Sequence, residues 1–238
     1  MSYNNSLFLD SLPHDEGVAL RGRLERIHLA QQQVLFEQDG PVSHVYFPVD
    51  AVVSQVVMLL DGEAVEAAMT GHDGITAAGP ALVAEPSYNR GIVQLSGDAF
   101  RCTAGDFRKI CAQRPYLNRA VVLHELALLA QVQQSAACNC THTLEGRLAR
   151  WLLRASDLHG GGVLDFTQEF LAQMLGVRRT SVTSIAHILQ RAGLIRYSRG
   201  HIEITNREAL EETACECYEA VKKRNNDFLK NLQSGAQA

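Results

Sequence analysis

The sequence has no long hydrophobic run and no sign of a signal peptide. No apolar stretch approaches the roughly 20 residues that a membrane-spanning helix requires, and residues 1–20 are polar and interrupted by Pro13. We therefore expect a cytoplasmic protein without membrane association. Of the 238 residues, 46% are hydrophobic and 20% are charged, which is typical of a globular chain with room for one large or two ordinary domains.

Motifs of common enzyme and metal sites are also absent. The sequence contains no G-x-S-x-G, no H-E-x-x-H, no P-loop and no C-x₂-C zinc pattern. Two C-x-C pairs do occur, but residues two apart on a helix point about 200° from each other. Each pair is therefore a poor chelate unless the helix breaks, and we expect reduced, idle thiols and no metal site. These pairs are Cys138 with Cys140 and Cys215 with Cys217.

The net charge of −4 is divided unevenly along the chain. Residues 1–105 hold 13 acidic and five basic residues, a net charge of −8, whereas residues 145–207 hold nine arginines and five acidic residues, a net charge of +4. Positive charge attracts the phosphate backbone of nucleic acids. The second half of the chain is therefore the candidate nucleic-acid-binding region.

The stretch from Phe166 to Glu203 carries the most specific pattern. It predicts two short helices around a turn at Gly176, and then a hairpin that turns at Ser198-Arg199-Gly200. The second helix, from about Arg178 to Arg191, has an apolar stripe opposite a polar face. The residues of that stripe are Val182, Ile185, Ile188 and Leu189.

Two helices followed by a hairpin form the winged helix-turn-helix pattern, in which the second helix enters the major groove of DNA. Arginine can donate paired hydrogen bonds to guanine, and serine or threonine can contact bases or phosphates. The alternatives are a helical hairpin with a solvated polar face, or a winged helix that contacts protein. The predicted DNA contacts are Gln168 of the first helix, Arg178, Arg179, Thr180, Ser181, Thr183 and Ser184 of the second, and Arg199 of the wing.

The segments Gly176-Val177-Arg178-Arg179-Thr180-Ser181-Val182 and Gly193-Leu194-Ile195 resemble the DNA-binding domain of the Crp–Fnr bacterial transcription regulators. The resemblance implies an α+β fold: an antiparallel β-roll like that of cyclic-nucleotide-binding domains, a long dimerisation helix and a C-terminal winged helix-turn-helix. It also implies a homodimer that binds double-stranded DNA at an inverted repeat, with RNA polymerase as a further partner. We expect a sensing domain with the dimer helix over residues 1–142, and a DNA-binding domain with a tail helix over residues 143–238.

The first half of the chain alternates in the manner of strands. Short strands at regular spacing over residues 34–102 predict an antiparallel roll or barrel. Before them, residues 1–30 are expected to form a lead-in helix with Leu20, Leu24 and Ile27 on one stripe.

From Pro115 to about Cys138 the helical period returns, with two apolar stripes side by side. Two stripes mean two surfaces to cover, which we assign to the roll and to a second copy of the chain. The alternative is a helix buried wholly inside one subunit. The predicted dimer interface consists of Val122, Leu126, Leu129, Gln133 and Ala136.

Two more helices are expected, separated by the winged region. The first covers residues 143–158 and is followed by a flexible break at glycines 160–162. The last begins after Asn206 and runs to about Leu232, with a frayed end. The arginines expected on the outward face of the first helix are Arg147, Arg150 and Arg154.

The family's cyclic-nucleotide members bind phosphate through a glutamate in a glycine-rich turn and an arginine followed by serine or threonine. Here the turn runs from Gly74 to Gly79 with Ala77 at the glutamate position, and Arg90 is followed by Gly91. A cyclic phosphodiester needs positive charge and donors, so we do not expect cyclic AMP binding. No cysteine precedes Cys102, which argues against an N-terminal iron–sulfur cluster. Nine histidines leave haem open, but no cofactor is predicted and the effector is not identified.

A β-roll could instead belong to a cupin-like metal enzyme. That chemistry needs several histidines and a glutamate that converge on one ion. Because the roll offers only isolated His44 and His72, we predict a regulator rather than an enzyme.

Overall fold

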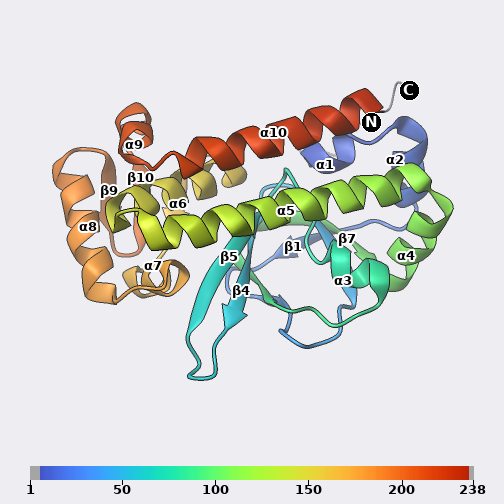
Figure 1. The fold of residues 1–238 in the computed structure, drawn as a ribbon, viewed down its shortest axis with the longest axis horizontal. Coiled ribbons are helices and arrows are strands. Elements are labelled where there is room, and N and C mark those ends of the chain that lie inside the picture. The colour runs from blue at the N-terminus through green and yellow to red at the C-terminus, as the bar shows by residue number, and fades with distance from the viewer. Residues whose placement is uncertain (1–5, 236–238) are drawn as a thin grey trace.

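The computed structural model describes residues 6–235 and shows a β-roll beside a winged helix-turn-helix. Two long helices, α5 and α10, run side by side along one side of the molecule (Figure 1). Within the described residues, no helix combines the length and apolar character needed to cross a bilayer.

The roll is built from two antiparallel sheets, as the alternation over residues 34–102 predicted. The sheets enclose a core that includes Leu29, Tyr46, Val53 and Val93. The first sheet has the order β1 (Glu25–Leu29), β7 (Gly97–Thr103), β3 (His44–Pro48), and the second has the order β2 (Val34–Phe36), β6 (Arg90–Leu95), β4 (Val52–Met58), β5 (Ala64–Thr70).

The predicted lead-in helix is wrong beyond Arg21. Two short helices, α1 (Leu7–Asp10) and α2 (His14–Arg21), are followed directly by strand β1, so Leu24 lies between elements and Ile27 lies in the strand. β1 also alternates, and pairing with β7 satisfies its backbone groups. In so short a segment, the helical and strand periods are hard to distinguish. Residues 1–5 of the predicted helix lie outside the described residues.

Helix α5 (Pro115–Thr141) follows α3 (Ala78–Val83) and α4 (Ala104–Gln113) and lies across the roll. Its covered face includes Leu117, Val121 and Gln131. The side-chain amide of Gln131 accepts from the backbone N–H of Met69 and donates to its carbonyl, at 2.8 and 3.3 Å. This helix confirms the predicted long helix and ends three residues later than expected.

Helix α6 (Leu144–His159) lies between the roll and the winged region. Its Leu152 belongs to one continuous core with Met69 of the roll and Val182 of the winged region. Because neighbours cover it on both sides, Arg147 is buried and Arg154 is partly buried, although both were predicted to face outward. Arg147 donates to the carbonyl of Leu175 at 2.5 Å, and Arg154 pairs with Asp73 at 2.7 Å. Arg150 is partly buried.

The winged helix-turn-helix is confirmed. It comprises α7 (Gln168–Leu175), α8 (Arg179–Arg191) and a three-stranded sheet of order β8 (Val163–Asp165), β10 (His201–Ile204), β9 (Ile195–Ser198). The threonine hydroxyl of Thr167 caps α7 by accepting from the N–H of Phe170. Glycines 160–162 all have positive φ. They lead into β8, a strand that was not predicted from the sequence.

One member of the predicted apolar stripe on α8 is misplaced. Ile188 is 47% exposed, whereas Ala186 is buried with Val182 and Leu189. The buried face of α8 therefore runs through Val182, Ala186 and Leu189, and Ile188 lies at its exposed edge.

The expected single tail helix is two helices, α9 (Arg207–Thr213) and α10 (Cys217–Gly235). Asn206 caps the first, as its side chain suggested, but the chain becomes extended at Ala214 with ψ of 148°. The far end of α10 is not frayed within the described residues. Leu232 is buried there, and Phe228 stacks on Phe8 of α1 at a centroid distance of 6.2 Å.

Candidate nucleic-acid interface

The outward face of α8 begins with Arg179, whose side chain is 66% exposed. Its Nε lies 3.8 Å from a carboxylate oxygen of Glu169, which is also exposed. An exposed ion pair of this kind contributes little free energy. The guanidinium of Arg179 is therefore available to a ligand that approaches the start of α8, where Arg178 and Thr180 are exposed as well.

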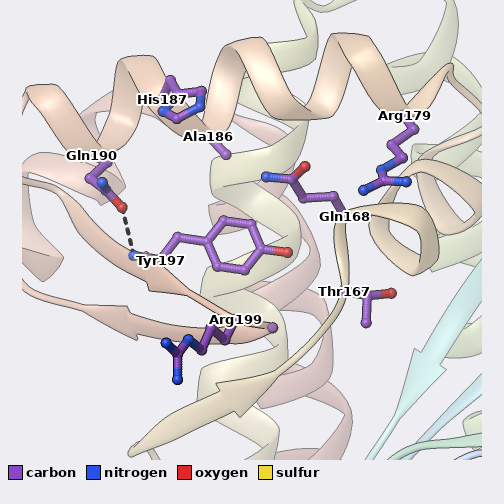
Figure 2. Close-up of a pocket in the computed structure, with 9 residues that line it drawn as sticks. Thr167, Gln168, Arg179, Ala186, His187, Gln190, Tyr197 and Arg199 are labelled. Atoms are coloured by element: carbon purple, nitrogen blue, oxygen red, sulfur yellow. Dashed lines mark hydrogen bonds between the residues drawn. The ribbon is translucent and has the colours of Figure 1, made fainter.

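A pocket of about 290 Å³ separates this face from the wing. In Figure 2, Arg179 and Arg199 lie on different sides of the pocket, with Gln168 and Tyr197 between them. The sequence reading placed the two arginines and Gln168 at the site but missed Tyr197 and Gln190. The residues that line the pocket are Thr167, Gln168, Arg179, Ala186, His187, Gln190, Tyr197, Arg199 and Gly200.

Two hydrogen bonds of Tyr197 join the walls of the pocket. The hydroxyl of Tyr197 donates to the carbonyl of Phe166 at 2.9 Å, and its backbone N–H donates to Oε1 of Gln190 at 2.8 Å (Figure 2). These bonds fix the first strand of the wing against α8 and α7. The signal for Gln190 was its position three residues after His187, one turn along the polar face of α8.

The predicted hydroxyl contacts differ in their surroundings. Thr183 is partly buried and its hydroxyl lies 2.6 Å from Oε1 of Gln168, so this pair links α7 to α8. With Oε1 engaged, the amide N–H groups of Gln168 are the part of that side chain that can serve a ligand. Ser184 donates back to the carbonyl of Thr180 at 3.0 Å, and Ser181 is partly buried.

Arg199 stands at the tip of the wing. It and Gly200 have φ values of 51° and 88° and join β9 to β10 in a two-residue turn. Two positive φ angles are characteristic of the type I′ turn, which matches the twist of the strands. The turn therefore holds Arg199 at the end of the wing, where it lines the same pocket as Arg179.

The five residues predicted as a dimer interface all lie on the exposed face of α5. Three of them are large and apolar: Val122, Leu126 and Leu129 are 47%, 56% and 51% exposed. The opposite face of the helix is covered by the roll and by α10. An uncovered apolar stripe of this kind on a long helix is typical of a helix that packs against a second helix.

The glycine-rich turn of the roll is occupied by side chains of α5. Nε2 of His124 accepts from the backbone N–H of Ile75 at 3.0 Å, and Oε1 of Glu125 accepts from the N–H of Gly79 at 3.0 Å. The cavity between Gly74, the end of β5, α5 and α10 measures about 10 Å³, compared with about 300 Å³ or more for a small-molecule site. Arg90, the candidate phosphate arginine, pairs instead with Glu37 at 2.6 Å.

The first C-x-C pair is divided between the interior and the surface. Cys138 is buried whereas Cys140 is exposed, as expected for residues two apart on a helix. The Sγ of Cys138 lies 3.5 Å from that of Cys215, beyond the end of α9. Cys102 and Cys111 are separate from this group, and burial raises the pKa of these thiols to about 11 and about 12.

Comparisons with known proteins agree with this arrangement. Residues 146–213 match the family described as the Crp-like helix-turn-helix domain. A search of curated proteins gave no match. The matched domain covers α7 and α8, and it includes each of the eight predicted DNA contacts.

Solved structures match over most of the chain. A putative Crp/Fnr transcriptional regulator from Eubacterium rectale has a TM-score of 0.67 at 16% identity, covering 86% of this chain and 95% of its own. FixK2 from Bradyrhizobium japonicum has a TM-score of 0.65 at 14% identity, with coverages of 81% and 98%. The c-di-GMP-responsive regulator CLP from Xanthomonas campestris has a TM-score of 0.65 at 13% identity, with coverages of 81% and 99%. The fold is thus the one seen in these regulators, and a cupin-like enzyme is not favoured.

Proposed function

We propose that this chain, which joins a Crp-like helix-turn-helix domain to the fold of Crp/Fnr regulators, is a DNA-binding transcription regulator that acts as a homodimer. The observation that carries the proposal is the exposed, arginine-bearing start of α8 beside the wing. A regulator of this kind works where the DNA and RNA polymerase are, so the proposed location is the cytoplasm and RNA polymerase is the proposed further partner. The proposed boundary between its two halves lies between residues 142 and 143, where α5 ends and α6 begins.

The exposed stripe of α5 supports the homodimer. A helix of 27 residues extends about 40 Å, long enough to pack along a second copy through Val122, Leu126 and Leu129. A two-fold axis through such a seam presents two copies of α8. In dimers of this class the recognition helices lie about 34 Å apart, one turn of DNA, so the operator is expected to be an inverted repeat.

The contacts of the glycine-rich turn support activity without cyclic AMP. The backbone N–H of Gly79 already donates to the carboxylate of Glu125 at 3.0 Å. A phosphate in that place would meet a negative charge rather than the donors and positive charge that it requires. The paired Arg90 and the small cavity reinforce the same conclusion.

Saturating cyclic AMP is therefore expected to leave the melting temperature and the DNA affinity unchanged. A ligand that binds the folded chain at about 100 times its dissociation constant would add about 2.7 kcal/mol of stability. Calorimetric melting with millimolar cyclic AMP measures this effect, and 5′-AMP serves as the control for nonspecific nucleotide binding. A clear rise in melting temperature with the cyclic nucleotide alone would show that the turn opens to accept it.

Arg179→Ala is expected to weaken operator binding by about 1–3 kcal/mol and to relax base preference at one symmetric pair of positions. The reason is that Arg179 lies on the exposed first turn of α8, where a side chain can reach guanine. Selection of bound sequences from a random DNA pool, followed by gel-shift titration, measures both effects.

The matched comparison is Arg199→Ala at the wing tip. Arg199 is expected to contact phosphate, so its loss should weaken all sequences alike and reduce the salt dependence by about one unit per contact. If Arg179→Ala weakens every sequence equally and the selected motif is unchanged, Arg179 does not read bases. If the wild-type chain selects no sequence at all, the winged helix serves another partner.

A further inference from the structure

Three cysteines and one histidine from distant parts of the chain meet where α5 ends. The Sγ atoms of Cys138, Cys215 and Cys217 and a ring nitrogen of His142 all lie within 4.8 Å of one another. The Sγ atoms of Cys138 and Cys215 are 3.5 Å apart, and the Sγ of Cys217 is 3.4 Å from Nδ1 of His142. Four ligands at zinc bond lengths in a tetrahedron lie about 3.6–3.8 Å from each other. The four side chains therefore already approach the spacing that one ion imposes.

The backbone explains how these residues converge. Cys138 lies in the last turn of α5, and His142 directly follows the helix with its backbone N–H donating to the carbonyl of Cys138 at 3.1 Å. Cys215 lies in the extended break after α9, and Cys217 is the first residue of α10. Because the tail helix is interrupted there, Cys215 and Cys217 can point to the same place, which two residues within one helix cannot do. Cys138 and Cys217 are buried.

The surroundings favour a metal-binding form of these side chains. Nε2 of His142 lies 3.1 Å from a carboxylate oxygen of Glu216, so the ring can donate there and leave Nδ1 free as a ligand facing the thiols. Metal-binding histidines are commonly oriented in this way by a carboxylate. The side-chain amide of Gln134 donates to the Sγ of Cys217 at 3.1 Å. This hydrogen bond stabilises the deprotonated form of the Cys217 thiol, which is the form that binds a metal.

The local charge also fits. Three thiolates, a neutral imidazole and a divalent ion carry a net charge of −1, which a nearby cation can balance. Arg150 of α6 is close enough for its positive charge to act on both Cys138 and Cys215. Its Nε is buried and has no hydrogen-bond partner in the part of the chain that the structure describes.

We propose that Cys138, His142, Cys215 and Cys217 form a tetrahedral site for one zinc ion, which ties the start of α10 to the end of α5. Soft thiolate ligands with one imidazole select zinc among the common divalent ions. An iron–sulfur cluster distributes its ligands over several metal atoms and requires a wider cage than this one. The site lies at the junction of α5 and α6, so the ion would fix the angle between the roll and the winged region.

The test uses the full chain, purified with a non-thiol reductant and without DNA, so that its outcome is independent of the proposed regulatory function. Elemental analysis is expected to find one zinc ion per chain. Replacement by Co²⁺ is expected to give the visible bands of a tetrahedral site and a thiolate charge-transfer band. Cys215→Ser and Cys217→Ser are each expected to lower zinc affinity by more than about tenfold, and Glu216→Gln by about tenfold through His142.

Cys140→Ser is the matched control, because Cys140 is exposed on the last turn of α5 and is not a member of the site. It is expected to retain zinc and the Co²⁺ spectrum. If a cysteine variant fails to fold by circular dichroism, Co²⁺ titration of the metal-free wild-type chain still decides the question. The proposal is overturned if the wild-type chain binds neither metal, if Cys140→Ser loses as much zinc as Cys215→Ser, if the metal is iron with sulfide, or if intact mass shows that Cys138 and Cys215 form a disulfide.

Discussion

The double variant Leu126→Asp, Leu129→Asp is expected to be a monomer that binds operator DNA at least about 100-fold more weakly than the wild-type chain. Both leucines are more than half exposed on α5 in the single chain, so the substitutions should leave the protomer folded. In a helical seam, however, each buried unpaired charge costs several kcal/mol, and each 1.4 kcal/mol is about a factor of ten in an equilibrium constant. Light scattering measures the assembly, and gel-shift titration measures the DNA affinity.

A matched control places the same two charges elsewhere. Leu59 and Leu60 are exposed leucines of the turn between β4 and β5, well away from the stripe of α5. Leu59→Asp, Leu60→Asp is therefore expected to remain dimeric. A dimer that persists in the Leu126, Leu129 variant would place the subunit interface on another surface.

The second large effect is a loss of stability as the pH rises from about 4.5 to about 7, and it depends on Glu66. This side chain of β5 lies under α6, where its carboxylate accepts from the indole N–H of Trp151 at 2.9 Å and from the hydroxyl of Ser54. Burial raises the pKa of Glu66 to about 7 from a usual value of 4.5, although the two hydrogen bonds and the charges of Arg150 and Arg154 oppose the rise.

The sign follows from proton binding. Between these two pKa values the folded chain keeps a proton on Glu66 that the unfolded chain releases, so raising the pH favours the unfolded chain. The contribution of Glu66 to the free energy of unfolding is expected to fall by up to about 3 kcal/mol across this window. Glu66→Gln stays neutral at every pH and should not show this loss.

Urea denaturation followed by circular dichroism, at pH 5 and at pH 7.5, measures the difference. The control is Glu63→Gln, which changes an exposed glutamate of the same hairpin and should retain the pH dependence of the wild-type chain. If wild type and Glu66→Gln lose stability in parallel, the carboxylate is ionised in the folded chain throughout the window.

The sequence predicted best those features that depend on a single element. The polar face of α8 and the exposed stripe of α5 repeat at the helical period, so both could be located from spacing alone. The misplaced residues depended on what covers an element. Arg154 lies on the polar side of α6, yet it donates to the carboxylate of Asp73 of the roll at 2.7 Å. The side-chain amide of Asn225 of α10 donates to the same carboxylate at 3.0 Å.

The cysteine cluster shows the same limit at longer range. Cys138 and Cys215 are separated by 77 positions, and their approach depends on the break after α9. Helical spacing separates Cys138 from Cys140, but the break after α9 removes that constraint between Cys215 and Cys217. It could not indicate that one member of the first pair would meet both members of the second.

The junction around Glu66 has a spectroscopic consequence. Trp151 is the only tryptophan of the chain, and it lies where the two halves meet. Its indole N–H reaches Glu66 of the roll, and its ring packs edge-on against Phe166, at 4.8 Å between centroids, just before α7. Separation of the halves would expose the indole to water and move its fluorescence to longer wavelength. The emission wavelength of Trp151 therefore reports whether the winged region is docked on the roll.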